Sequence, residues 1–192
     1  MYRISAKVSE MGVLYFVRHG QTVWNVENKI CGATDSPLTE KGHEQARETG
    51  RILKESIDKG QIHIDQILTS PLSRAKDTAD EIGKMTGLPV QVESRLIEQN
   101  FGRWEGTPRD GADFRLAKEN FCDSFSGGES MMRVAQRVYN LIDDVIAEES
   151  KTFLFVAHNG IARIVESYFR DMTNSEFAAF GIRNAQVREY RF

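Results

Sequence analysis

The stretch LYFVRHGQTVWN, residues 14–25, joins an apolar run directly to an arginine and a histidine. Short runs rich in branched and aromatic residues are typical of buried strands, and this one predicts a strand over 13–18. Gly20 then allows a tight turn out of the sheet, because glycine adopts backbone conformations closed to other residues. The stretch therefore predicts a strand that delivers Arg18 and His19 to one edge of a sheet.

The rest of the chain alternates strands with helices. Strands are predicted over 13–18, 64–69, 89–93, 153–157 and 185–192. Amphipathic helices are predicted after the N-caps Thr39, Ser70 and Ser130, with Pro71 in the first turn of the second, and over about 161–169 and 174–180. This alternation predicts an α/β fold with a largely parallel sheet covered on both faces by helices.

The composition predicts a soluble globular protein of one domain, residues 1–192. Apolar residues make up 40% and charged residues 28%, and the net charge of -3 favours neither nucleic acid nor an anionic membrane as partner. The apolar runs are too short to cross a bilayer, and residues 1–12 lack the apolar core of a secretory signal, so they are interpreted as an N-terminal extension. Cys31 and Cys122 show no CxxC spacing, which indicates reduced thiols and a cytoplasmic location.

The interval from about 94 to 129 differs from the rest of the chain. It is rich in glycine, carries Phe101 and Trp104, and shows only a weak helical pattern near 112–120. Loops of this length inside a compact domain are usually functional. We expect this segment to contribute to a binding or catalytic site.

A second strand ends like the first. The run over 153–157 is followed by His158, Asn159 and Gly160, so two strands deliver a histidine where the chain leaves the sheet. In an open α/β sheet, ligands bind beyond the carboxyl ends of the strands. The two histidines therefore predict a shared site, although a lone histidine there would more often pack or cap.

Arg74 supports an anion at this site. It lies in the first turn of a predicted helix, where the helix dipole disfavours a cation by about 0.3–1 kcal/mol. A salt bridge would explain it, and so would a bound anion, because arginine matches phosphate oxygens bidentately. Arg18 and Arg74 could hold a phosphoryl group, with His158 as a further donor.

Such a pocket suits a histidine nucleophile. Neighbouring positive charge should lower the pKa of His19 and leave a free lone pair at pH 7. Attack on phosphorus would give a phosphohistidine, and the leaving alkoxide would need a proton from a carboxylic acid. Glu98, Glu105 and Glu129 are the candidates, and spacing does not choose among them.

These segments together resemble the histidine phosphatase superfamily, the phosphoglycerate mutase-like proteins. RHGQTVWN with ENKICGATDSPLTEKGHEQA is similar to the family's nucleophile segment, and SPLSRAKDTA to its second-arginine segment. EQNFGRWEG resembles its acid loop, GGES the following helix start, and VAHNGIAR its second-histidine segment. The matches run in the family's order from residue 14 to about 163.

The resemblance implies a three-layer α/β/α fold and a mechanism without metal or cofactor. It implies His19 as the phosphorylated nucleophile, with Arg18, Arg74 and His158 around the phosphoryl group, and it selects Glu98 as the proton donor. Trp104 and Glu105 are expected to anchor the loop. The further residues expected at the phosphate site are Thr22, Asn25, Cys31, Gly32 and Asn159. Asn159 stands where many members have glycine, and its amide could add a hydrogen bond or reshape the loop.

Hydrolysis of a small phosphorylated metabolite is favoured over a mutase reaction. The interval from Glu98 to Gly128 is short. It lacks the long insertion of the mutase branch, and it lacks the adjacent arginine pair that this branch uses for the substrate carboxylate. Arg109 falls where that branch has a lysine, so a contact with a substrate carboxylate or second phosphate stays open. A phosphoglycerate mutase using the same phosphohistidine is the alternative.

Other classes are weighed as well. A noncatalytic phosphate-binding module has no need of His19 and Glu98 together, and no HExxH or Asp-rich spacing supports a metalloenzyme. A peptide substrate stays open because the loop is short. The exposed edge of the C-terminal strand could pair with a second subunit as a homodimer.

Overall fold

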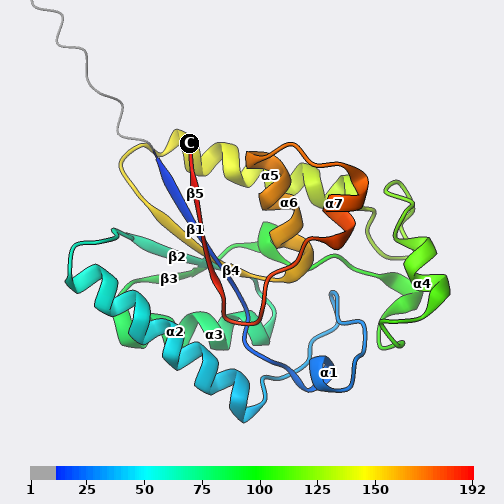
Figure 1. Ribbon diagram of the computed structural model, residues 1–192, viewed down its shortest axis with the longest axis horizontal. Helices are drawn as coiled ribbons and strands as arrows, with labels where there is room; N and C mark the ends of the chain where they lie inside the picture. Colours follow the sequence, from blue (N-terminus) through cyan, green and yellow to red (C-terminus); the bar gives the residue numbers. More distant parts are fainter. Residues whose placement is uncertain (1–11) are drawn as a thin grey trace, which may run out of the picture.

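A five-stranded sheet forms the centre of the computed structural model, which describes residues 12–192 (Figure 1). In the order β3-β2-β4-β1-β5, the strands are Val90–Val92, Gln66–Thr69, Phe153–Ala157, Val13–Arg18 and Val187–Arg191. The first four are parallel, and β5 lies antiparallel to β1 at the edge. The predicted extension, residues 1–12, lies outside the described residues except for Gly12.

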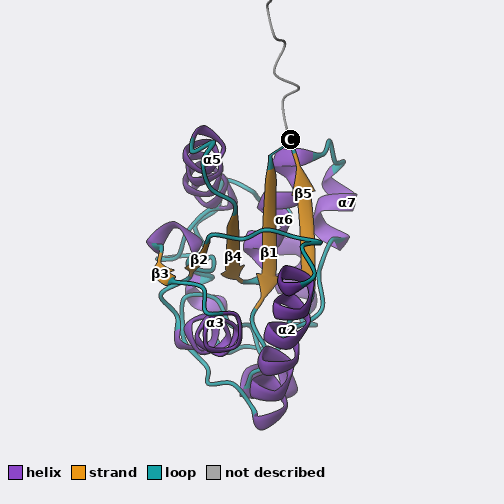
Figure 2. Ribbon diagram, turned by 90° about the vertical axis from the view of Figure 1, so that its left-hand side faces the viewer, coloured by secondary structure: helices purple, strands orange, loops and turns teal. Residues whose placement is uncertain are grey.

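The helices cover both faces of this sheet (Figure 2). They are α1 (Val23–Val26), α2 (Glu40–Asp58), α3 (Ser73–Thr86), α4 (Ala112–Ala117), α5 (Met131–Ala147), α6 (Asn159–Phe169) and α7 (Asn174–Ala179). Helices α2 and α3 lie on one face, and α5 and α6 lie on the other (Figure 1). The mixed sheet between two helical layers confirms the predicted α/β fold.

Strand β1 shows why both faces are covered. Side chains alternate across a strand, so Leu14 and Phe16 pack into the apolar cluster under α5 and α6, whereas Tyr15 and Val17 pack under α2 and α3. All four are buried. A strand that is apolar on both sides can be accommodated only between two layers.

Two of the three predicted helix caps are confirmed. The side chains of Thr39 and Ser130 accept hydrogen bonds from the first turns of α2 and α5. The prediction for Ser70 and Pro71 is wrong: α3 begins at Ser73, and its N-cap Leu72 makes no side-chain bond. The Ser70 hydroxyl lies instead against His158, and this contact explains the displaced cap.

The segment 94–129 folds into short pieces. It holds two 3-10 turns, Ser94–Leu96 and Gly102–Trp104, followed by α4. In Figure 1, α4 stands away from the sheet, on the side where the carboxyl ends of β1 and β4 open. Within residues 12–192, no helix combines the length and the apolar character needed to span a membrane.

Candidate active site

Three neighbouring strands end at the same place. The amide of His19, after β1, donates to the Ala157 carbonyl of β4 at 2.9 Å, and the amide of Ser70, after β2, donates to the Val156 carbonyl at 3.1 Å. This parallel pairing brings His19, His158 and Ser70 together, although they are far apart in sequence. We call His19, Ser70, Arg74 and His158 the floor of the site.

His19 is held as a neutral imidazole. Its Nδ1 lies 2.7 Å from the Gly20 carbonyl, which can only accept, so Nδ1 carries the proton and Nε2 keeps its lone pair. Burial, and then the charges of Arg18 and Arg74, hold the pKa of His19 well below its ordinary value of 6.5. A buried imidazole with an unprotonated nitrogen can act as a nucleophile at neutral pH.

His158 is bonded at both ring nitrogens. Nδ1 accepts from the Arg74 Nε at 3.2 Å, so Nε2 carries the proton that faces the Ser70 hydroxyl at 2.7 Å. Burial and Arg74 lower the pKa of this imidazole too, and its ring centroid lies 5.2 Å from that of His19. Donation from His158 to a phosphoryl oxygen would require Nε2 to leave Ser70, so that role stays a prediction.

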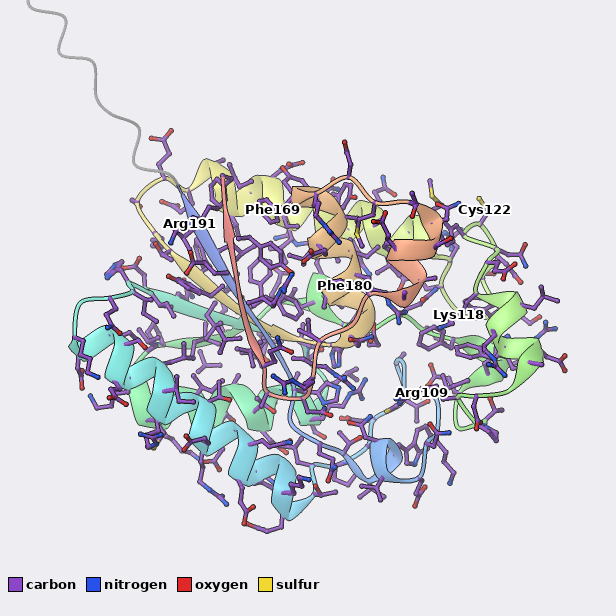
Figure 3. The ribbon with its side chains drawn as sticks, viewed as in Figure 1. Arg109, Lys118, Cys122, Phe169, Phe180 and Arg191 are labelled. Atoms are coloured by element: carbon purple, nitrogen blue, oxygen red, sulfur yellow. The ribbon has the colours of Figure 1, made fainter. Side chains whose placement is uncertain are left out.

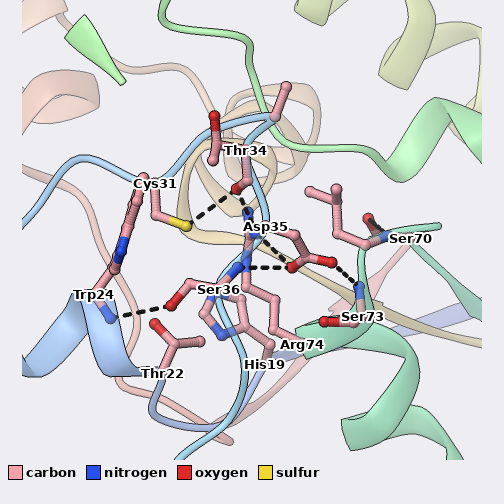
Figure 4. Close-up of polar contacts among 12 residues, drawn as sticks. His19, Thr22, Trp24, Cys31, Thr34, Asp35, Ser36, Ser70, Ser73 and Arg74 are labelled. Carbon is pink, nitrogen blue, oxygen red and sulfur yellow. Dashed lines mark hydrogen bonds and ion pairs between the residues drawn. The ribbon is translucent and has the colours of Figure 1, made fainter. Parts of the chain in front are cut away.

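Arg74 is fully buried and tied to the loop after α1 (Figure 4). Its Nη2 donates to the Gly32 carbonyl at 2.6 Å, and its Nη1 donates to the Thr34 carbonyl at 3.0 Å. Asp35 pairs with the same Nη1 at 3.2 Å and accepts from the Ser73 amide at 2.6 Å. The predicted salt bridge and the predicted place near an anion site therefore coexist, and one Nη2 hydrogen is left for a ligand.

A cavity of about 120 Å³ lies over His19. Its walls are Arg18, His19, Asn25, Ile30, Cys31, Glu98, Phe101, Arg109, Phe114, Lys118, Asn159, Gly160 and Arg163. Seven of the predicted site residues are among them: Arg18, His19, Asn25, Cys31, Glu98, Arg109 and Asn159. The other four, Thr22, Gly32, Arg74 and His158, lie outside this wall.

Glu98 is the only carboxylate in the cavity wall. It is 6% exposed, and its Oε2 accepts from the Gly160 amide at 2.9 Å, at the start of α6. A Cβ at position 160 would lie 2.4 Å from the Glu98 Oε1, so any larger residue there would displace this carboxylate. The other two candidate acids are engaged elsewhere: Glu129 pairs with Arg137, and Glu105 accepts from four backbone amides.

Glu105 ties two loops together, as predicted for an anchor. Its carboxylate accepts from the amides of Gly32, Ala33 and Thr34 on one side and from Phe101 on the other. Only a glycine fits at position 32 between these loops, because a Cβ there would lie 2.1 Å from the Gln99 carbonyl oxygen. Gly32 thus has a packing role and accepts from Arg74 through its carbonyl, and its expected contact with phosphate stays a prediction.

Thr22 supports the site from outside the cavity. Its hydroxyl accepts from the Asn25 amide at 3.1 Å, and the Asn25 Oδ1 accepts from the Thr22 amide at 3.2 Å, which forms a capping box for α1. The expected contact of Thr22 with phosphate stays a prediction. Asn25 faces the cavity with its amide nitrogen available.

Asn159 and Arg18 both hold the segment before β5. The Asn159 Oδ1 accepts from the Ile182 amide at 3.0 Å, and the Arg18 Nη1 donates to the Ile182 carbonyl at 2.8 Å. The side-chain amide of Asn159 therefore adds a hydrogen bond, and this bond holds the loop before β5; its expected contact with phosphate stays a prediction. Burial, followed by Arg109, lowers the pKa of Arg18 to about 10.

Cys31 has an apolar role in the cavity wall. Its Sγ donates to the Thr34 carbonyl at 3.2 Å, and burial raises the pKa of the thiol to about 11. A thiol of that pKa is neither a nucleophile nor a charged contact at neutral pH. Cys31 therefore shapes the cavity next to Asn25.

Sequence reasoning missed several residues of the site. The Asn184 amide donates to the carbonyls of His19 and Gly20 at 2.9 and 3.1 Å, and no motif marks this residue in the sequence. Lys118 and Arg163 also line the cavity. The only signals in the sequence were the weak helical pattern near 112–120 for Lys118 and, for Arg163, its position at the end of VAHNGIAR. Across residues 12–192, no three His, Cys, Asp or Glu side chains gather as a metal site would require.

Comparison with known proteins agrees with this geometry. The model of the histidine phosphatase superfamily (branch 1) matches residues 14–192. Glucosyl-3-phosphoglycerate phosphatase of Mycobacterium tuberculosis is 32% identical over 183 residues, which cover 88% of this chain and 79% of the relative. Phosphoserine phosphatase 1 of Hydrogenobacter thermophilus is 32% identical over 90% of this chain and 82% of its own. The solved structure of a phosphoglycerate mutase from Bacillus anthracis has a TM-score of 0.78 and 25% identity, over 95% of this chain and 88% of that one.

Proposed function

This chain belongs to the histidine phosphatase superfamily, and we propose that it is a metal-independent phosphomonoesterase acting on a small phosphorylated metabolite. Its relatives are phosphatases and phosphoglycerate mutases, so it is an enzyme of one of these two kinds. The observation that carries the proposal is the neutral His19, whose Nε2 is free in a cavity that also holds Glu98.

In the first step, His19 Nε2 attacks the phosphorus of the bound ester. The N–P bond forms as the P–O bond to the leaving group breaks, and Glu98, entering as the carboxylic acid, gives its proton to the departing alkoxide. The guanidinium groups of Arg18 and Arg74 stabilise the charge that develops on the phosphoryl oxygens. The Nδ1 proton keeps its hydrogen bond to the Gly20 carbonyl, so the imidazole ring keeps its orientation during the attack.

In the second step, water replaces the alcohol. The Glu98 carboxylate takes a proton from water as its oxygen attacks phosphorus, the N–P bond breaks, and inorganic phosphate leaves. His19 is again a neutral imidazole and Glu98 again carries a proton. The cycle needs no redox step and no further reactant.

A phosphoglycerate mutase is the alternative. The four cationic side chains of the cavity wall support it, because a mutase has to hold a phosphorylated product in its site. In that case a hydroxyl of the substrate, and not water, would attack the phosphohistidine: its P–O bond would form as the N–P bond breaks, and its proton would pass to the Glu98 carboxylate. The two reactions share the first step and differ only in the acceptor. They are separated by incubating the purified protein with 3-phosphoglycerate and measuring both free phosphate and 2-phosphoglycerate.

Trapping the phosphoenzyme tests the proposal directly. We expect a base quench during turnover of a ³²P-labelled monoester to leave label on the protein, stable in alkali and lost in acid, at His19. His43, half-buried on α2 and away from the cavity, supplies the matched control: His43→Ala should retain the label and His19→Ala should lose it. Turnover without any label at His19, or turnover abolished by EDTA and restored by zinc, would overturn the mechanism.

A further inference from the structure

A second cavity, a groove of about 690 Å³, lies beside the cavity over His19. It follows the segment 181–186, which leads from Phe180 to β5 (Figure 3). Arg18 and Asn159 line both cavities and so belong to the wall that the two share. The proposed reaction takes place in the cavity over His19, so the groove has no task in it.

The amide side chains in the groove wall present donors. The side-chain oxygens of Gln45, Gln186 and Asn159 each accept from a backbone amide, at 2.9, 3.0 and 3.0 Å. A backbone N–H can be met only by the oxygen of a side-chain amide, so these bonds fix which way each amide group is turned. In all three residues the NH₂ group is therefore left for a ligand.

The backbone of the segment 181–186 offers few acceptors to the groove. The carbonyls of Ile182, Arg183 and Ala185 already accept hydrogen bonds from the protein, at 2.8, 3.2 and 2.8 Å. A ligand that fits this wall has to supply the acceptors itself.

The groove wall also carries positive charge without negative charge. Arg18 and Arg183 belong to it, whereas the carboxylates of Glu44 and Glu48 lie in the adjoining hollow. None of the ion pairs formed among residues 12–192 includes Arg183. Donors and positive charge gathered in one groove favour an oxyanion as its ligand.

Arg18 connects the groove with the phosphoryl site. A guanidinium has five N–H donors, and the one bond that this side chain makes within residues 12–192 is from Nη1 to the Ile182 carbonyl at 2.8 Å. Its Nε is buried and meets no acceptor among those residues. A phosphoryl group over His19 and an anion in the groove would share the remaining donors, so each should bind less tightly when the other is present.

We propose that the groove is a second anion site, which takes a free tetrahedral oxyanion such as inorganic phosphate and thereby inhibits the enzyme through Arg18. The phosphate dianion matches the two arginines of the wall, and its oxygens can accept from donors on several sides. The inhibition, though not the binding, rests on the proposed function, because it requires Arg18 to hold the phosphoryl group. Phosphate is also the product of the proposed reaction, so the site slows the enzyme as product accumulates.

Side-chain amide signals in NMR spectra report binding in the groove. The ¹⁵N-labelled protein is titrated with inorganic phosphate, and the NH₂ signals of Gln45 and Gln186 should shift and saturate. Gln186→Glu keeps an oxygen for the Arg183 amide but replaces the donor by a negative charge, so the Gln45 signal should then need about tenfold more phosphate. Arg183→Gln should raise the requirement about fivefold.

Steady-state inhibition tests the coupling through Arg18. Phosphate added during hydrolysis of p-nitrophenyl phosphate should raise KM and also lower kcat, because an anion in the groove draws on donors that stabilise the transition state. In Arg183→Gln phosphate should raise KM alone, since it then binds only over His19. Arg115→Gln is the matched control, because Arg115 is exposed on α4 and outside both cavities, and it should behave like the unaltered protein.

The outcomes separate the groove from the reaction. Signals of Gln45 and Gln186 that stay in place, or a Gln45 signal that titrates equally in Arg183→Gln and Gln186→Glu, mean an adventitious ion only and overturn the site. Saturable binding with an unchanged kcat overturns the inhibition through Arg18. Binding in the groove of a protein that forms no phosphohistidine supports the anion site and overturns the proposed function.

Discussion

The floor and the rim of this cavity are built in opposite ways. Every member of the floor is buried, and most of its side-chain polar atoms are bonded within the protein, as in the chain from Arg74 through His158 to Ser70. The rim cations of the cavity wall are Arg109, Lys118 and Arg163, which lie in a loop, at the C-cap of α4 and on α6. Lys118 has no hydrogen-bonding partner for its ammonium among the residues described. The floor keeps only the His19 Nε2 and one Arg74 Nη2 hydrogen for a ligand, whereas the whole ammonium group of Lys118 has no partner among residues 12–192.

This difference assigns different tasks to the two regions. Backbone pairing between β1, β4 and β2 fixes the strand ends that are followed by His19, His158 and Ser70. Fixed positions suit a reaction that needs a preorganised nucleophile. Charges without partners suit recognition, because they gain most when an anion arrives. We therefore assign the reaction to the floor with Glu98, and the choice of substrate to the rim.

The largest effect is expected from removing the nucleophile in the floor. His19→Ala should lower kcat by about 10³-fold or more for every substrate, because no other group in the wall can accept the phosphoryl group. The fold should survive, since His19 lies after β1 and not within the apolar clusters. Turnover and the thermal unfolding midpoint are measured together, and activity above a few per cent would mean that the nucleophile is misassigned.

Glu98→Gln tests the proposed proton donor, which is the carboxylate in the cavity wall. Loss of the proton donor should slow alkyl phosphates by about 10²–10⁴-fold, and aryl phosphates with good leaving groups far less, because the latter depart without a proton. The measurement is kcat for a series of esters graded by the pKa of the leaving alcohol. Equal slowing across the series would contradict a donor role.

Glu105→Gln weakens the connection between the loop 32–34, which contacts Arg74 of the floor, and the loop at Phe101. The amide cannot accept four backbone hydrogen bonds as the carboxylate does, so we expect the free energy of unfolding to fall by about 2–3 kcal/mol and Tm by about 5–10 °C. Calorimetry measures the shift. Glu119→Gln, at an exposed position after α4, is the control and should unfold like the unaltered protein.

The smallest effect concerns the protonation of Lys118. Its pKa in the folded protein, about 8, lies below the ordinary 10.5, so the charged form is present at pH 7 and is lost as the pH rises through 8. A bound anionic substrate favours the charged form, so KM for a phosphate monoester should rise about fivefold from pH 7 to pH 9. Lys118→Gln should flatten this rise, and a persistent rise in that variant would assign the titration to another group.

The same shift has a consequence for stability. Because the pKa of Lys118 is lowered on folding, the folded state binds fewer protons than the unfolded state between about pH 8 and 10.5, and this group makes folding more favourable as the pH rises across that range. Below pH 8 the unpaired charge is a cost to the folded protein. An unpaired charge retained at such a cost agrees with recognition by the rim.

The sequence by itself determined the layers of the fold and brought the two histidines of the site together. Apolar runs of strand length, the caps at Thr39 and Ser130, and the histidines after two strands are local features, because the side-chain periodicity of strands and helices is set by the backbone. Two parallel strands must end at one edge, so His19 and His158 could be placed together without coordinates. The family resemblance added Glu98.

Only the tertiary structure decided what each polar group in the site contacts. It moved Ser70 from a helix cap to a partner of His158, placed Thr22 and Gly32 in supporting positions, and brought Asn184 under His19 from the far end of the chain. It also gathered Lys118 and Arg163 around one cavity from two separate elements. Such contacts depend on loop paths and on packing between distant segments, and no local periodicity encodes them.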